Sequence, residues 1–286
     1  MSIVELLRIR QWYKNLVVFL PIVFGQQMGN LHALLLTCAG FFSLCLASSS
    51  NYIINDLVDR KDDKQHPEKR LRPLAAGRVK PAYAIAAALV LMLLSLGIGV
   101  LLSWRFFLFV FGLLGLSQLY NFWLKREAFA DILVIAINFV LRAVSGAYVI
   151  VRSGKPYIWV SPWLILCPFF LSLFISAGKR ESDALVLGEK KALHKRVLEV
   201  YDREMTKALM HISTTLLIIS YGLYSFLSVN PTLMYTLPIA LYVIFRYLHL
   251  AEMGSVIARH PELAYRDKRL IIGILTWVIM VLVILH

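Results

Sequence analysis

Charge is scarce in this chain. Of its 286 residues only 16% are Asp, Glu, Lys or Arg, whereas 59% are hydrophobic, and the mean hydropathy is +0.70. Several apolar runs reach about 20 residues, the length that an α-helix needs to cross a bilayer. The sequence therefore predicts an integral membrane protein rather than a water-soluble domain.

The apolar runs also lack the alternation of apolar and polar residues that is typical of a membrane β-barrel. Backbone polar groups must be paired within the bilayer core, so continuous runs are expected to be helices. We expect an all-α, polytopic membrane helical bundle of about nine helices, forming one membrane-embedded domain over residues 1–286. The first segment is short and carries a proline, so it is expected to be tilted or broken. The nine segments lie at roughly 15–29, 32–58, 81–102, 106–124, 130–151, 158–177, 206–227, 232–249 and 270–285.

Several signatures of soluble enzymes are missing. The three cysteines, Cys38, Cys45 and Cys167, all lie in apolar segments, where they pack as small side chains and have no expected chemical role. His66 and His194 stand alone in charged stretches, without the spacing of metal ligands. No Walker loop, GxGxxG turn or GxSxG elbow is present, which argues against nucleotide-binding and hydrolase folds.

Acids are absent from the predicted outer loops, whose cations are only Arg105, Arg152 and Lys155. Most of the 30 Lys and Arg fall in the alternate, inner segments if the N-terminus is inside. The positive-inside rule then predicts a multi-pass protein of the cell membrane, with a cytoplasmic N-terminus and an outer C-terminus. The net charge of +13 is therefore a topology signal and an attraction for anionic lipid, and no nucleic-acid partner is expected.

The charged stretch after the second predicted helix opens with Asp56, Asp59 and Asp63. If that helix continues, spacings of three and four residues place all three carboxylates on one face. Two conditions would offset their repulsion: a divalent cation held by oxygen ligands, or hydration of an exposed helix end. Hydration is the commoner explanation in general. Here a magnesium-bound phosphorylated substrate is favoured, because the acids emerge from the membrane and are followed by Lys69, Arg70, Arg72 and Arg78.

A second polar stretch, expected to be a loop, begins at Lys179 and Arg180, directly after the sixth apolar run. These residues are either a positive-inside cap or an anion site that binds phosphate oxygens. The second interpretation would place them beside the three aspartates and complete a cytoplasmic pocket.

Arg142 lies midway along the fifth predicted helix, where a charge needs a partner or water. Asp131 and Asn138 share its helix face, so Arg142 is either in a buried structural pair or an anion contact in a cavity. Polar residues also fill the lower half of the second helix, where they either join helices or line a wet cavity: Ser48, Ser49, Ser50, Asn51, Tyr52 and Asn55.

The pattern Asn55-Asp56-x-x-Asp59-x-x-x-Asp63, at the cytoplasmic end of a second helix in a protein of about nine helices, resembles the UbiA superfamily of intramembrane prenyltransferases. The resemblance covers essentially the whole chain. It implies that the first acidic motif binds Mg²⁺ and, through it, a diphosphate.

The second motif departs from the usual aspartate pair DxxxD, since this chain has Lys179-Arg180-x-x-Asp183. That pattern is similar to the bacterial branch that includes decaprenyl-phosphate phosphoribosyltransferase. Further similar stretches are Arg10-Gln11-Trp12-x-Lys14-Asn15, His66-Pro67-x-Lys69-Arg70-x-Arg72-Pro73, Tyr120 through Lys125, and Phe139-x-Leu141-Arg142-Ala143.

The branch implies transfer of 5-phosphoribose from phosphoribosyl diphosphate to a polyprenyl phosphate, with release of diphosphate and dependence on Mg²⁺. Metal and catalysis would depend on Asp56 and Asp59, with Asp63 as a further metal ligand. One alternative is transfer of a prenyl group from prenyl diphosphate to an aromatic or lipid acceptor, and another is a small-anion transporter. A homo-oligomer is left open. The residues expected to bind substrates are Lys14, Asn55, Lys69, Arg70, Arg72, Tyr120, Lys125, Arg142, Lys179, Arg180 and Asp183.

Overall fold

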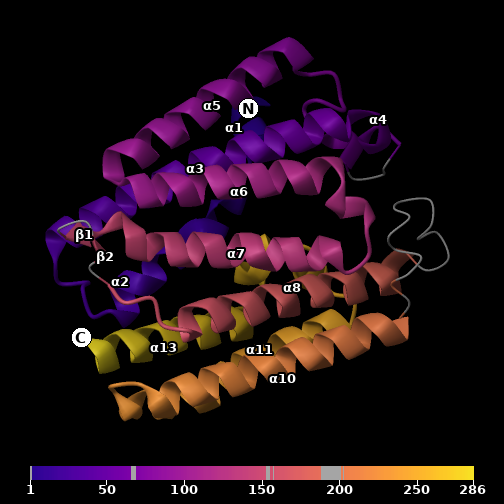
Figure 1. Ribbon diagram of the computed structural model, residues 1–286. Helices are drawn as coiled ribbons and strands as arrows, with labels where there is room; N and C mark the ends of the chain where they lie inside the picture. Colours follow the sequence, from indigo (N-terminus) through magenta and orange to yellow (C-terminus); the bar gives the residue numbers. More distant parts are fainter. Residues whose placement is uncertain (1, 66–68, 153–154, 157, 188–200, 202) are drawn as a thin grey trace. The chain divides into compact units, whose positions relative to one another are not determined.

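The computed structural model describes residues 2–65, 69–152, 155–156, 158–187, 201 and 203–286, so His66 and His194 lie outside it. The described chain is almost entirely helical (Figure 1), which confirms the predicted all-α class. Within these residues, eight helical segments are long and apolar enough to cross a membrane. The helices concerned are α3 (Leu31–Val58), α5 (Pro81–Leu102), α6 (Trp104–Phe122), α7 (Ala130–Val149), α8 (Trp163–Leu187), α10 (Arg203–Leu227), α11 (Leu237–Glu252) and α13 (Lys268–Leu285).

The first of the nine predicted helices is broken, as its proline suggested. Short helix α1 (Ser2–Leu7) is followed by the 3₁₀ helix η1 (Ile9–Phe19) and by α2 (Leu20–Phe24). Pro21 lies in the first turn of α2, where its missing N–H breaks no helical hydrogen bond. Arg8, between α1 and η1, has a φ of 49°, which turns the chain sharply.

The remaining elements are short connections. The largest departure from prediction is the second polar stretch, because α8 continues to Leu187 and makes Lys179 to Asp183 helical rather than a loop. Two residues each of β1 (Val151–Arg152) and β2 (Lys155–Pro156) pair antiparallel, with Val151 opposite Pro156. The other connections are α4 (Arg60–Asp63), η2 (Lys69–Leu71), η3 (Leu124–Arg126), η5 (Pro231–Thr236), α12 (Val256–Arg259) and η6 (Pro261–Arg266).

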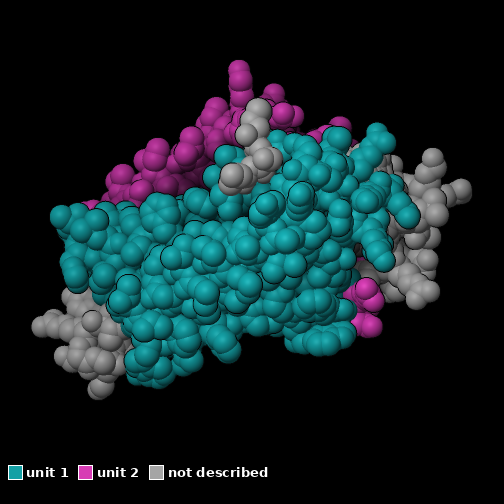
Figure 2. Space-filling model, turned by 90° about the horizontal axis from the view of Figure 1, so that it is seen from above, with its two compact units in different colours: residues 1–125, 141–160 teal, residues 126–140, 161–286 magenta. Residues whose placement is uncertain are grey.

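The chain forms two compact units, coloured teal and magenta in Figure 2. Unit 1 comprises Met1–Lys125 and Leu141–Val160, and unit 2 comprises Arg126–Val140 and Ser161–His286. Helix α7 contributes its first part to unit 2 and its last part to unit 1. The expectation of one domain over the whole chain stays a prediction.

In unit 1, α3 packs against α5 and α6, and small polar side chains join these helices. Ser43 Oγ donates to the carbonyl of Ser95 at 2.9 Å, and Ser95 Oγ donates back to the carbonyl of Ser43 at 2.8 Å. Ser50 Oγ donates to the carbonyl of Ala88 at 2.8 Å. Small residues of this kind let membrane helices approach closely, so Ser50 joins helices rather than lining a cavity.

In unit 2, α8 packs against α10, α11 and α12, and α11 packs against α13. Asp267 caps α13 by accepting from the backbone N–H of Leu270 at 2.7 Å, and Arg246 of α11 donates to the same carboxylate at 2.6 Å. The hydrogen bond from Arg246 holds the pKa of Asp267 below its usual value. One carboxylate thereby fixes the start of α13 against α11.

Gly146 of α7 lies close to the backbone of η1. A Cβ at this position would lie 2.0 Å from the carbonyl oxygen of Val18. We therefore expect Gly146→Ala to lower the free energy of unfolding by about 1–3 kcal/mol, because η1 and α7 must move apart. Thermal unfolding in detergent measures the effect.

The matched control is Gly112→Ala in α6, where an added Cβ would meet no atom within 4 Å. This variant should unfold at the same temperature as the parent or slightly higher, since alanine favours a helix over glycine. Equal stability of the two variants would contradict the proposed close approach.

Candidate functional site

The three predicted aspartates lie where α3 passes into α4. We call Asp56, Asp59 and Asp63 the acid cluster. Helix α3 ends at Val58, but the N–H of Asp59 still donates to the carbonyl of Asn55 at 2.9 Å, and the N–H of Asp63 donates to that of Asp59 at 2.8 Å. The helical path therefore continues almost unbroken through the acids, as the spacing predicted.

Two members of the acid cluster converge on one guanidinium. Arg72 Nη1 lies 3.0 Å from Asp56 Oδ1 and 2.7 Å from Asp63 Oδ2. Arg8 Nη2 lies 2.5 Å from the same oxygen of Asp56. The side chains of Asp56 and Asp63 are only 3% and 4% exposed, against 22% for Arg8 and 24% for Arg72. The acids therefore lie inside, and the more accessible arginines cover them.

The third carboxylate has its own cation, since Lys125 Nζ pairs with Asp59 Oδ1. Burial raises the pKa of Asp63, while the charge of Arg72 opposes that rise. Among the described residues, no three Asp, Glu, His or Cys side chains are arranged to hold a metal ion by themselves. Each acid of the cluster is instead paired with a cation, and we call Arg8, Arg72 and Lys125 the covering cations.

Arg8 is a site residue that the sequence did not reveal. It belongs to no motif, and its only signal was its place in the basic N-terminal segment. Its guanidinium carbon lies 5.2 Å from the ring centroid of Tyr52, one turn before Asp56 on α3. Stacking on the ring and pairing with Asp56 together hold this guanidinium over the acid cluster.

Other residues of unit 1 that were predicted to bind substrate contact side chains outside the acid cluster. Arg142 Nε donates to Asn15 Oδ1 at 3.0 Å, and Ser48 Oγ donates to the same buried oxygen at 3.2 Å. The Lys14 ammonium lies 5.9 Å from the ring centroid of Tyr13. Their role as substrate contacts stays a prediction. Of the rest, Arg70 is exposed, while Asn55, Lys69 and Tyr120 are half-buried.

In unit 2, Arg180 pairs with Asp131, whose side chain is fully buried. Asp131 Oδ1 also accepts from the hydroxyl of Tyr201 at 2.6 Å, and that hydroxyl accepts from the N–H of Phe129 at 2.8 Å. Burial raises the pKa of Tyr201, so its hydroxyl stays protonated. Arg180 thus helps to join α7, α8 and the residues before α10, and Asp131 pairs with Arg180 although it shares the helix face of Arg142.

Glu181 is a second residue that the sequence did not reveal. Its carboxylate is fully buried, accepts from Thr206 Oγ1, and lies 3.7 Å from Arg203 Nε. The sequence placed it in a charged loop, and only the continuation of α8 buries it against α10. Its predicted neighbours remain more accessible, since Lys179 is exposed and Asp183 is half-exposed.

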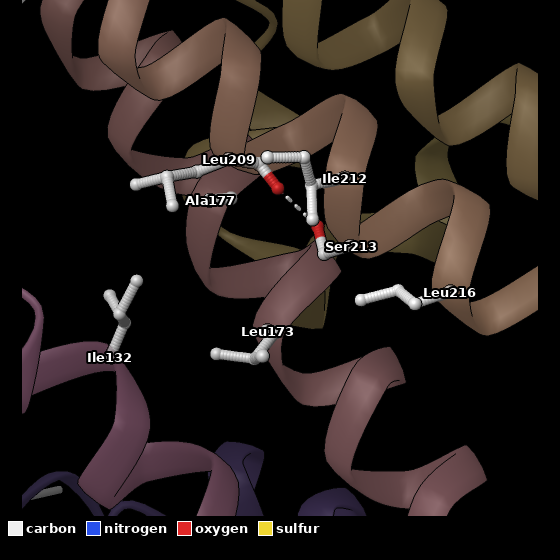
Figure 3. A pocket seen from close by; sticks show the side chains of 7 residues that line it. All are labelled: Ile132, Leu173, Ala177, Leu209, Ile212, Ser213 and Leu216. Atoms are coloured by element: carbon white, nitrogen blue, oxygen red, sulfur yellow. Dashed lines mark hydrogen bonds between the residues drawn. The ribbon is translucent and has the colours of Figure 1, made fainter.

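An apolar pocket lies about one helical turn from the Asp131–Arg180 pair. Figure 3 shows its side chains around a common hollow, contributed by α7, α8 and α10. Ser213 is the one hydroxyl among them, and it donates to the carbonyl of Leu209 at 2.8 Å, so the lining behaves as apolar. The lining residues are Ile132, Leu173, Ala177, Leu209, Ile212, Ser213 and Leu216.

The Asp131–Arg180 pair yields a stability prediction. Asp131→Asn leaves the Arg180 charge without its carboxylate at a site only 11% exposed, so the free energy of unfolding should fall by about 3–5 kcal/mol. Adding Arg180→Gln should recover at least about 1 kcal/mol, because the buried charge that lost its Asp131 carboxylate is then gone. Thermal unfolding of the two single variants and the double variant tests the pair, and strictly additive losses would contradict it.

Comparison with known proteins identifies the family. The model of the UbiA prenyltransferase family matches residues 16–255. A decaprenyl-phosphate phosphoribosyltransferase of Mycobacterium tuberculosis is 30% identical over 97% of this chain and 92% of its own. A Sinorhizobium fredii protein called uncharacterized protein y4nM is 37% identical over 63% of this chain, although the match spans only 34% of that protein.

The fold agrees with the sequence match. A solved structure of a UbiA homolog from Archaeoglobus fulgidus superposes with a TM-score of 0.72 over 99% of both chains, at 18% identity. The eight apolar helices and the family match together define a multi-pass membrane protein. This chain is therefore a membrane-embedded transferase that belongs to the UbiA prenyltransferase family.

Proposed function

We propose that this protein transfers 5-phosphoribose from phosphoribosyl diphosphate to a polyprenyl phosphate and releases diphosphate. The relatives named decaprenyl-phosphate phosphoribosyltransferase support this reaction, since they match almost the whole chain at about 30% identity. We place the chemistry at the cytoplasmic membrane surface, with the N-terminus inside, as the distribution of Lys and Arg favours.

The observation that carries the proposal is the acid cluster with its covering cations. Three carboxylates and three cationic side chains meet within one unit, where a diphosphate and further phosphate groups need both metal-binding oxygens and positive charge. A phosphoribosyl donor and a lipid phosphate bring more negative charge than a prenyl diphosphate and a neutral acceptor. A site with so many cations suits the more anionic pair of substrates.

The acid cluster has the donor chemistry of a Mg²⁺ site. Mg²⁺ in such enzymes is held by one or two carboxylates together with substrate phosphates and water, rather than by a complete protein cage. Asp56 and Asp63 direct one oxygen each at a common point, now taken by Arg72 Nη1, so a cation between these oxygens is a fitting occupant. Asp59 would complete the ligand set. A bound Mg²⁺ would offset the charge that develops on the leaving diphosphate.

The protein's own part in the reaction is positioning and electrostatics. The bond from the ribose carbon to the diphosphate oxygen breaks, and a bond from that carbon to an oxygen of the lipid phosphate forms. Because a phosphate monoester is already anionic at neutral pH, the attack needs no strong general base. Lys69, Arg70 and Arg72 would attract the donor's phosphates from the loop that follows the acid cluster.

Prenyl transfer is the second candidate. The A. fulgidus homolog was solved bound to DMAPP and Mg²⁺, and the family model carries the name of prenyltransferases. Incubating the purified protein with Mg²⁺ and labelled phosphoribosyl diphosphate plus polyprenyl phosphate should yield labelled lipid. Product only from prenyl diphosphate and an aromatic acid would establish prenyl transfer instead.

The acid cluster gives the direct test by substitution. Asp56→Ala and Asp59→Ala should each lower the rate of phosphoribosyl transfer by at least about 100-fold, because each removes a ligand of the cation that would offset the charge of the leaving group. Elution of both variants as monodisperse protein in detergent would show that they still fold and insert.

Asp62→Ala is the matched control. Asp62 lies on α4 next to Asp63, but its side chain is exposed. Its loss should leave the rate within about twofold of the parent, as for a surface residue. Parental rates in either Asp56→Ala or Asp59→Ala would rule out the metal-binding role of the acid cluster.

A further inference from the structure

We propose that Arg8 and Arg72 are displaceable counter-ions, which pair with Asp56 and Asp63 until a divalent cation enters with the diphosphate and then turn to phosphate oxygens. The proposal rests on the proposed function, since it assumes a diphosphate-bearing donor. It gives a functional role to Arg8, which belongs to no sequence motif. It also predicts that the divalent cation and the diphosphate each increase the affinity for the other.

The first argument is the position of the arginine nitrogens. Arg72 Nη1 bridges Asp56 and Asp63 at 3.0 and 2.7 Å, which is the place where a metal ion shared by these carboxylates would lie. Arg8 Nη2 contacts the same oxygen of Asp56 as Arg72 Nη1 does. A cation held between these two carboxylates would compete with Arg72 for the same place, and it would repel Arg8 from the Asp56 oxygen that Arg8 contacts.

The second argument is charge. Ionised Asp56, Asp59 and Asp63 carry three negative charges and the covering cations three positive charges, so the six side chains balance one another. A divalent cation alone would leave the site with an excess of two positive charges in a partly buried place, which is unfavourable. A divalent cation together with a diphosphate adds little or no net positive charge. The displaced arginines then meet phosphate oxygens, for which the guanidinium geometry is well suited.

The third argument is access. The carboxylates of Asp56 and Asp63 are 3% and 4% exposed, whereas the Arg8 and Arg72 side chains that cover them are 22% and 24% exposed. The arginines are thus the side chains of the site that incoming phosphate oxygens can reach first. The Tyr52 ring, 5.2 Å from the guanidinium carbon of Arg8, would keep this side chain near the acid cluster after its pairing with Asp56 is lost.

Binding of Mn²⁺, followed by electron paramagnetic resonance of the purified full-length protein, tests the proposal without any transfer reaction. The parent should bind Mn²⁺ at least about tenfold more tightly when inorganic diphosphate is supplied with it than when Mn²⁺ is added alone. Protein carrying Asp56→Asn serves as the blank for Mn²⁺ held by diphosphate in solution.

Arg72→Gln should raise the affinity for Mn²⁺ alone by at least about tenfold, because the competing charge is gone, and should reduce the gain from diphosphate. Arg8→Gln should act in the same direction, and it serves if Arg72→Gln does not fold. The control is Arg78→Gln, which removes an equal charge from the same loop but one that pairs with Glu5 at 2.7 Å. It should match the parent.

Two results would overturn the proposal: tight binding of Mn²⁺ to the parent without diphosphate, or a loss of affinity for Mn²⁺ alone in Arg72→Gln and Arg8→Gln. Neither result depends on which group is transferred. The proposed phosphoribosyl transfer can therefore fail while the counter-ion exchange stands, and the exchange can fail while the transfer stands.

Discussion

The constraint on which the site depends is the cost of burying carboxylates without compensation. Asp56 and Asp63 are almost fully buried at the end of a membrane helix, and an ionised carboxylate in such a place needs cations or hydrogen-bond donors around it. The chain meets this need with arginines from the N-terminal segment and from the loop after α4. Asp59, which is more exposed, pairs with Lys125 of η3, just after α6. Sequence segments far apart are thus joined by charge balance, and the same arrangement brings carboxylate oxygens and cationic side chains to one place.

Much of the fold could be predicted because long apolar runs in the sequence predict membrane helices. Among the described residues, eight of the nine expected helices form, most of them near their predicted bounds. The first segment is divided where η1 ends and α2 begins, just before Pro21. The end of α8 was missed, because Lys179 to Asp183 have the composition of a loop. In the structure they continue α8, and Glu181 is buried and accepts from Thr206 of α10, a contact between distant residues that the local sequence does not reveal.

The site was predictable in its acids and less so in their partners. The spacing of Asp56, Asp59 and Asp63 by helical periods identified the acid cluster, and Arg72 and Lys125 were named from the charged stretches around it. Arg8 escaped notice because an arginine near the N-terminus of a membrane protein is ordinarily a topology signal. Arg180 was expected to bind an anion, yet it is held by Asp131, which the periodicity of α7 had grouped with Arg142. Charge patterns thus identify which residues need partners, while the packing of helices decides which partner each one obtains.

A density map of the protein with Mg²⁺ and phosphoribosyl diphosphate would test the central claim most directly. The account predicts metal density between the carboxylates of Asp56 and Asp63, with the diphosphate on its outer side and the guanidinium groups of Arg8 and Arg72 turned to phosphate oxygens. Donor density elsewhere in the protein, with Arg72 still bridging the two aspartates, would contradict it.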